Sequence, residues 1–138
     1  MSNIGKNFSS WDGEAFEKLL FDYLDRGYLE NIITFFKHEP EKLNLIPKML
    51  TDERVRLRLG AFAILEELKQ TNAEALKGLV PSLIELLNSS DKKIRADACY
   101  ALEIIGDSSA KAALYKALSY EEDPLLKEFM QEAIKNLE

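Results

Sequence analysis

The chain has 138 residues, enough for one domain, and its 46% hydrophobic and 30% charged content is that of a folded protein rather than a disordered one. A net charge of −6 argues against nucleic-acid binding as the main task, because that affinity comes from lysine and arginine neutralising phosphates. The single cysteine excludes an intramolecular disulfide and a cysteine-based zinc site.

The N-terminal stretch lacks the apolar core of a secretory signal. No apolar run approaches the roughly 20 residues that a membrane-spanning helix needs. We therefore expect a cytoplasmic protein without a membrane partner.

Nearly the whole chain after the first residues has the apolar periodicity of helices, and no stretch alternates as a strand does. A polar, flexible N-terminal arm is expected before a single helical domain. The expected units are the arm 1–11 and the domain 12–138, which divides into an aromatic-rich cap or repeat, 12–40, and three helix pairs, 41–70, 72–106 and 107–138.

Capping residues predict where several helices begin and end. Thr51 or Asp52 is expected to cap a long helix that ends near residue 70. The run SSD at 89–91 is expected to open the second helix of the next pair, and Gly106 to close it.

In two of the expected helix pairs the first helix carries a proline at an equivalent position, Pro47 in one and Pro81 in the other. A proline inside a helix removes one backbone hydrogen bond and bends the axis. The third unit has Ala112 at this place. The kink is therefore expected in two units and not in the third.

The second helices of three pairs share one apolar stripe. With Leu57, Ile94 and Leu126 as position 0, apolar residues recur at positions 4, 7, 8 and 11, which lie on one side of a helix. The units are 37 and 32 residues apart, a spacing typical of helical solenoids. Position 1 is basic in every unit: Arg58, Arg95 and Lys127.

The segments LRLGAFAILEEL (57–68), IRADACYALEIIGD (94–107) and SAKAALYKAL (109–118) resemble HEAT repeats, especially the short repeats of the phycobilisome lyase type. The resemblance covers residues 41–138. It implies an all-α fold, a right-handed α-solenoid of about four antiparallel helix pairs, with the second helices lining a concave face. It also implies protein binding or scaffolding, and a structural role for the basic residue at position 1. Asp91 is expected to pair with Arg95, four residues later.

Positions 2, 6 and 9 are expected to line the concave face, as an acidic trough with a hydrophobic centre. Such a surface suits a basic or amphipathic segment of another protein. The alternatives are that Leu59 and Phe62 are simply buried, or that the face has no partner. The candidate partner-binding residues are Leu59, Phe62, Glu66, Tyr100, Glu103, Glu128, Glu132 and Trp11.

Trp11 and the aromatic residues that follow it suggest a second surface. Capping of the solenoid is the simpler interpretation, because terminal repeats must cover an otherwise open core. Self-association through this end is the alternative.

No catalytic, cofactor or metal site is predicted. Cys99 is interpreted as a packed small residue, and the lone His38 as a residue that complements a helix C-terminus. The acidic run Glu121–Asp123 is interpreted as a helix N-terminus. The function predicted is a non-enzymatic scaffold or adaptor. The alternatives are a lyase-like or accessory subunit that handles a chromophore or cofactor and, less favoured by the charge, nucleic-acid binding.

Overall fold

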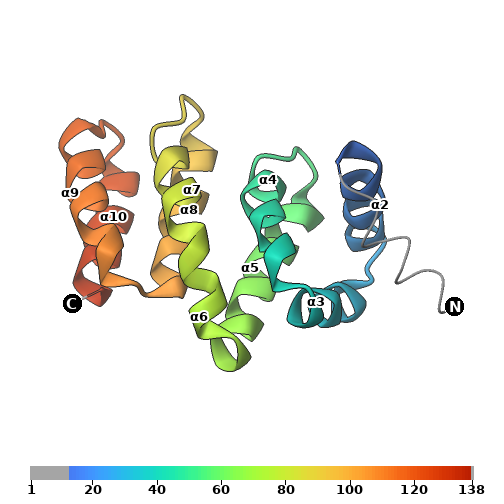
Figure 1. Ribbon diagram of the computed structural model, residues 1–138. Helices are drawn as coiled ribbons and strands as arrows, with labels where there is room; N and C mark the ends of the chain where they lie inside the picture. Colours follow the sequence, from blue (N-terminus) through green and yellow to red (C-terminus); the bar gives the residue numbers. More distant parts are fainter. Residues whose placement is uncertain (1–12, 138) are drawn as a thin grey trace, which may run out of the picture.

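A computed structural model describes residues 13–137 and contains only helices and connecting turns over that range (Figure 1). The α-helices are α2 (Glu14–Asp25), α3 (Leu29–His38), α4 (Ile46–Leu50), α5 (Val55–Thr71), α6 (Ala73–Leu76), α7 (Val80–Leu86), α8 (Lys92–Ile105), α9 (Lys111–Tyr120) and α10 (Pro124–Asn136). Three short 3₁₀ helices directly precede α4, α7 and α9: η1 (Pro40–Leu45), η2 (Lys77–Leu79) and η3 (Ser108–Ala110).

The helices stack in pairs from one end of the molecule to the other, which is an all-α solenoid (Figure 1). The two helices of each pair from α4 onward run antiparallel, whereas α3 lies crosswise to α2 (Figure 1). The pairs are α2–α3, α4–α5, α7–α8 and α9–α10, with α6 and η2 extending the third pair. The second helix α8 packs against α5 on one side and against α10 on the other, so these three helices form a continuous row. At the N-terminal end, α5 packs against both α2 and α3.

The predicted apolar stripe is the core of the stack. Positions 0, 4, 7, 8 and 11 of α5, α8 and α10 are buried in every unit except at Ile94, which is half-buried. Small side chains such as Ala61, Ala98 and Ala101 are fully buried and let the helix axes approach. Each stripe is covered by the neighbouring pairs, because one pair alone cannot bury it.

The predicted ends of α8 are confirmed. Asp91 caps the helix by accepting a hydrogen bond from the Lys93 N–H at 2.8 Å. Gly106 ends it in the left-handed conformation, with φ of 72°. The prediction for α5 was wrong, because the helix begins at Val55, and Asp52 instead accepts a hydrogen bond from the Arg54 N–H within the preceding turn.

The proline positions mark a change of helix type. α4 begins at Ile46 and α7 at Val80, each one residue before a proline and directly after a 3₁₀ segment. In the third unit α9 begins at Lys111 after η3, again one residue before the equivalent position, which is Ala112. The same change therefore occurs without proline, so the proline is compatible with it but not required for it.

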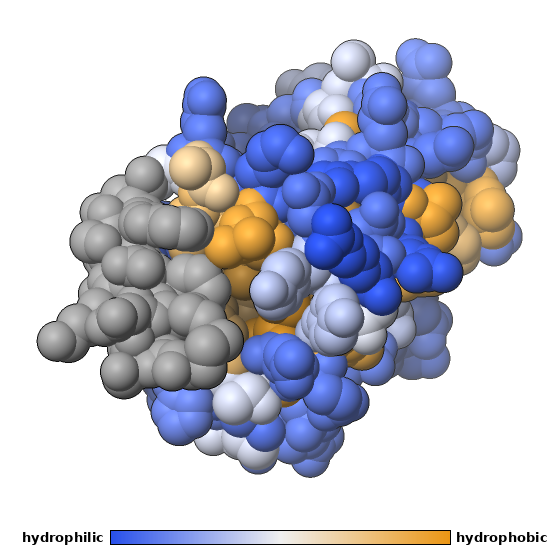
Figure 2. All heavy atoms as spheres, turned by 90° about the vertical axis from the view of Figure 1, so that its right-hand side faces the viewer, coloured by the Kyte–Doolittle hydropathy of each residue, from blue (hydrophilic) through white to orange (hydrophobic). Residues whose placement is uncertain are grey.

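The N-terminal end of the stack includes an apolar pocket, whereas α10 at the other end exposes polar residues together with the apolar Leu125 and Phe129. On α10 the outward positions 1, 5 and 9 are the exposed polar residues Lys127, Gln131 and Lys135. At the other end a small pocket of about 110 Å³ between α2 and α3 is almost wholly apolar and includes Leu19 and Phe35. Figure 2 views this end and shows apolar side chains gathered on it. Trp11, the candidate there, lies outside the described residues.

Candidate functional site

Two arginines join adjacent repeats, as expected for position 1. Arg58 on α5 donates from Nε and Nη2 to the two carboxylate oxygens of Asp97 on α8, at 2.6 and 3.1 Å. Arg95 on α8 donates in the same bidentate way to Glu121, at 2.8 and 3.0 Å. Paired donors of this kind give both strength and a fixed geometry. These arginines are therefore structural residues of the repeat junctions.

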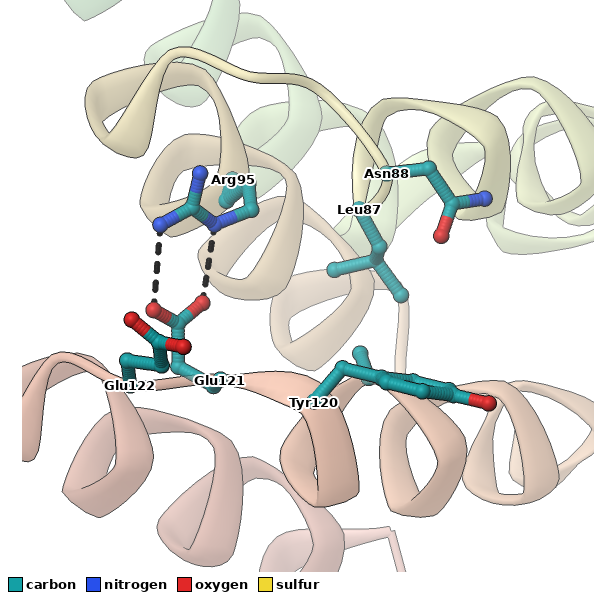
Figure 3. A pocket seen from close by; sticks show the side chains of 7 residues that line it. Leu87, Asn88, Arg95, Tyr120, Glu121 and Glu122 are labelled. Atoms are coloured by element: carbon teal, nitrogen blue, oxygen red, sulfur yellow. Dashed lines mark hydrogen bonds and ion pairs between the residues drawn. The ribbon is translucent and has the colours of Figure 1, made fainter.

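Arg95 lines a pocket of about 310 Å³ beside α9 (Figure 3). Its guanidinium also donates to the carbonyl oxygens of Ser89 and Ser90, so its charge is already satisfied. The expected ion pair with Asp91 was wrong, because the carboxylate of Asp91 is engaged as the helix cap. Glu121 is the partner instead, and the nearby guanidinium lowers the pKa of its carboxyl group.

Positions 2, 6 and 9 of α5, α8 and α10 form an accessible surface, which we call the second-helix face. It comprises Leu59, Ala63, Glu66, Ala96, Tyr100, Glu103, Glu128, Glu132 and Lys135. None of these side chains is buried, and Leu59 is 61% exposed and Tyr100 44% exposed. The interpretation of Leu59 as a buried residue is thus wrong, whereas Phe62 is half-buried against the core.

Tyr100 is the centre of this face and is held from the α5 side. Its ring meets Phe62 edge to face, with centroids 4.9 Å apart, and its hydroxyl donates to Glu66 at 3.0 Å. The hydrogen bond to Glu66 stabilises the protonated phenol and raises the pKa of Tyr100. The structure therefore brings three of the predicted residues together into one preorganised contact.

A pocket of about 290 Å³ opens on the other side of Tyr100, between α8 and α10. It is lined by Ala96, Asp97, Cys99, Tyr100, Glu103, Phe129 and Glu132. Phe129 is 47% exposed and was not predicted as a site residue. The sequence feature that could have identified it is an aromatic residue at position 3 of α10, which lies outside the apolar stripe.

The carboxylates around this pocket differ in whether they have a hydrogen-bond or ion-pair partner. Asp97 is bound by Arg58, and Glu103 accepts a hydrogen bond from the side-chain amide of Asn136. Glu128 and Glu132 are exposed and make no ion pair with any other residue in the range 13–137. With Lys135 as the basic residue that α10 adds to the face, the α10 edge of the face carries a net negative charge.

Leu59 lies at a second depression, nearer the N-terminal end. This depression of about 450 Å³ is lined by Leu24, Gly27, Leu29, Arg56, Leu59, Gly60 and Ala63. Gly60 lets α5 approach α2 closely, because a Cβ at that position would lie 2.9 Å from the Leu24 methyl groups. The second-helix face thus has an apolar depression at each end and Tyr100 between them.

The remaining candidate residues have structural surroundings. Cys99 is buried, and desolvation raises the pKa of its thiol to about 12. His38 is the last residue of α3. Asp123 caps α10, as expected for the acidic run, by accepting from the Leu126 N–H. Between residues 13 and 137 no cluster of three or more histidine, cysteine or acidic side chains is placed to hold a metal ion.

Arg54 and Arg56, which precede Arg58 in the sequence, are also engaged by protein oxygen atoms. Arg54 pairs with Asp22 and Asp52, and Arg56 donates to the carbonyl oxygen of Asp25.

No helix in the described part of the chain is both long and apolar enough to cross a bilayer.

Stacked helix pairs, a shared apolar stripe and arginine-linked junctions define an α-solenoid. The profile of the HEAT repeats family matches residues 43–135, which is more than half of the chain. The chain therefore belongs to the HEAT-repeat family, and α2 and α3 lie outside the matched range. No curated protein and no solved structure gives a significant match.

Proposed function

We propose that this protein is a non-catalytic adaptor that binds a basic or amphipathic segment of another protein on its second-helix face. The observation that carries the proposal is the exposure of Leu59, Tyr100 and Phe129 along one row of helices, beside unpaired carboxylates. Aromatic and apolar side chains supply most of the binding energy at such surfaces, and the surrounding charges select the partner.

Three features support this proposal. HEAT-repeat proteins commonly serve as interaction scaffolds, and this chain is a member of that family. Tyr100 is fixed in place by Phe62 and Glu66 before any partner arrives, which reduces the entropy lost on binding. The charge of the face, with Glu66, Glu128 and Glu132 exposed, complements a basic segment.

A peptide-display selection on the immobilised full chain tests the proposal without knowledge of the partner. We expect selected peptides to be enriched in lysine or arginine and in apolar residues. Their binding to the purified chain is then measured by fluorescence anisotropy, at low and at high salt. Binding is expected to weaken as salt rises, because the charges of the face are solvent-exposed.

Two tyrosine variants locate the binding surface. Tyr100→Ala removes the central aromatic of the second-helix face, whereas Tyr115→Ala removes a tyrosine of similar exposure on the first helix α9. We expect the first variant to weaken peptide binding by about tenfold or more and the second to leave it unchanged. Equal effects of both variants, or a selection that yields no basic peptides, would contradict the proposal.

A further inference from the structure

The junction between α8 and α10 is built differently from the junction between α5 and α8, although the repeat positions are the same. In the first junction Phe62, at position 5, packs against Tyr100, at position 6 of the next helix. In the second junction position 5 is Cys99 and position 6 is Glu132. A small thiol and an outward carboxylate thus replace two aromatic rings in contact.

The arginine contact changes at the same place. Arg58 reaches Asp97 at position 3 of the next helix. The equivalent residue of α10 is Phe129, and Arg95 binds Glu121 in the turn before α10 instead. Phe129 and Cys99 therefore stand where Asp97 and Phe62 stand at the first junction, so neither contact of that junction is repeated here. A pocket of about 290 Å³ lies beside Tyr100 at this second junction.

The lining of this pocket has a defined chemistry. Two half-exposed aromatic residues, Tyr100 and Phe129, form its walls, and the neutral Cys99 and Ala96 contribute to its lining. Glu132 lines it with a carboxylate that has no ion-pair partner within the described residues, whereas Asp97 is already bound by Arg58. Aromatic faces and a free carboxylate together attract a cation that keeps an apolar stem.

We infer that this pocket binds a cationic side chain of the partner segment, foremost an arginine, between Tyr100 and Phe129 and against Glu132. A planar guanidinium stacks on aromatic rings and bonds a carboxylate through paired donors, so arginine fits better than lysine. The inference rests on the proposed function and identifies one residue of the segment that the second-helix face recognises.

The test is a titration of the isotope-labelled full chain with a capped peptide, Ala-Ala-Arg-Ala-Ala, followed by two-dimensional amide NMR. The same peptide with citrulline in place of arginine has nearly the same shape without the charge. We expect saturable shifts at Ala96, Tyr100 and Phe129 with the arginine peptide. Binding of the citrulline peptide is expected to be about tenfold weaker, because the cation–aromatic contact and the ion pair are both lost.

Matched variants separate a pocket from general attraction to an acidic surface. Glu132→Gln and Glu128→Gln remove the same charge from the same exposed side of α10, but only Glu132 lines the pocket. Glu132→Gln is expected to weaken binding about tenfold and Glu128→Gln to leave it within about twofold. Cys99→Phe gives position 5 of α8 the same residue as Phe62 at position 5 of α5. The larger side chain is expected to fill the pocket and abolish the shifts.

In the NMR titration, three outcomes would overturn the inference: no shifts, shifts spread over the acidic surface, or equal effects of the two glutamine variants. Because Cys99→Phe changes a buried position, the exposed Glu132→Gln decides the matter if that variant does not fold. The display-selected peptides provide a separate check. If their binding is weakened by Tyr100→Ala but not by Glu132→Gln, the inference about the pocket is overturned and the proposed adaptor function is not. A selection without binders would instead reject the adaptor function.

Discussion

Arg58 on α5 holds both carboxylate oxygens of Asp97 on α8, across 39 residues of sequence. The side chains are 27% and 11% exposed, so the pair is largely shielded from water. Arg95 and Glu121 repeat the relationship one unit later, with the acid supplied by a turn rather than a helix. The junctions are thus joined by guanidinium–carboxylate pairs above a continuous apolar core.

We expect Asp97→Ala to lower the free energy of unfolding by about 1–3 kcal/mol, because it leaves a partly buried guanidinium without its partner. Urea denaturation measures the change. The control is Glu74→Ala, which removes an exposed partner of Lys77 and should cost less than about 0.5 kcal/mol. Addition of Arg58→Ala to Asp97→Ala should cost less than Arg58→Ala alone; strict additivity would mean that the two side chains do not interact.

The lowered pKa of the Glu121 carboxyl group predicts how the stability of the fold depends on pH. Arg95 lowers its pKa in the folded protein below the usual value near 4.5. The unfolded chain therefore binds the proton more readily, so this contribution to stability is complete above about pH 4.5 and is lost as the pH falls through the folded pKa. We expect Glu121→Gln to flatten the stability profile in that acidic window. Parallel profiles for both proteins would rule out the contribution.

Leu65 and Leu102 occupy position 8 of consecutive second helices and are fully buried. Replacement of either by alanine removes buried methyl groups and leaves a cavity. We expect each variant to lose about 2–5 kcal/mol of stability, measured by chemical denaturation. The exposed Leu125→Ala on α10 serves as the control and should change stability little. Unchanged melting of both core variants would be incompatible with the assigned core.

Two glycines are expected to respond to alanine with opposite signs. Gly106 has φ of +72°, where an alanine side chain is strained, so Gly106→Ala should cost about 1–2 kcal/mol. Gly78 lies in η2 with open space around its Cβ position, and Gly78→Ala should stabilise by about 0.4–1 kcal/mol. Thermal melting of the two variants side by side makes the comparison; the same sign for both would refute it.

Cys99 is expected to be unreactive in the folded protein. Its thiol is buried and its pKa is raised to about 12, so little thiolate exists at about pH 8. A thiol-specific disulfide reagent should react slowly with the native chain and rapidly in guanidinium chloride. Fast reaction of the native chain would show that the base of the α8–α10 pocket is open to solvent.

Local periodicity was sufficient to predict the core and most helix ends from the sequence. The stripe at positions 0, 4, 7, 8 and 11 depends only on the geometry of one helix, and Gly106 and Asp91 act within a few residues of their own position. Asp52 misled the assignment of α5 because its side chain binds the backbone two residues later, in a turn that precedes the helix.

The contacts between repeats were harder to predict. The partner of Arg95 depends on how the turn before α10 is placed against α8, so the local spacing of four residues pointed to Asp91 and not to Glu121. Phe129 was missed for the same reason: its role appears only when position 3 of α10 is compared with Asp97, the equivalent residue of α8. Exposure of Leu59, Tyr100 and Glu132 followed from helical geometry, but the pocket between α8 and α10 did not.

The single row α5–α8–α10 also determines how the molecule should unfold. In a stack of this kind each unit touches only its neighbours, so stability is a sum of unit terms and coupling terms along one dimension. The Arg58–Asp97 pair lies in the middle of the row and links the α2–α5 half to the α7–α10 half. The pair contributes to this central coupling together with the apolar contacts of α8 with α4 and α5. If the coupling as a whole is weakened enough, a single melting transition is expected to separate into two.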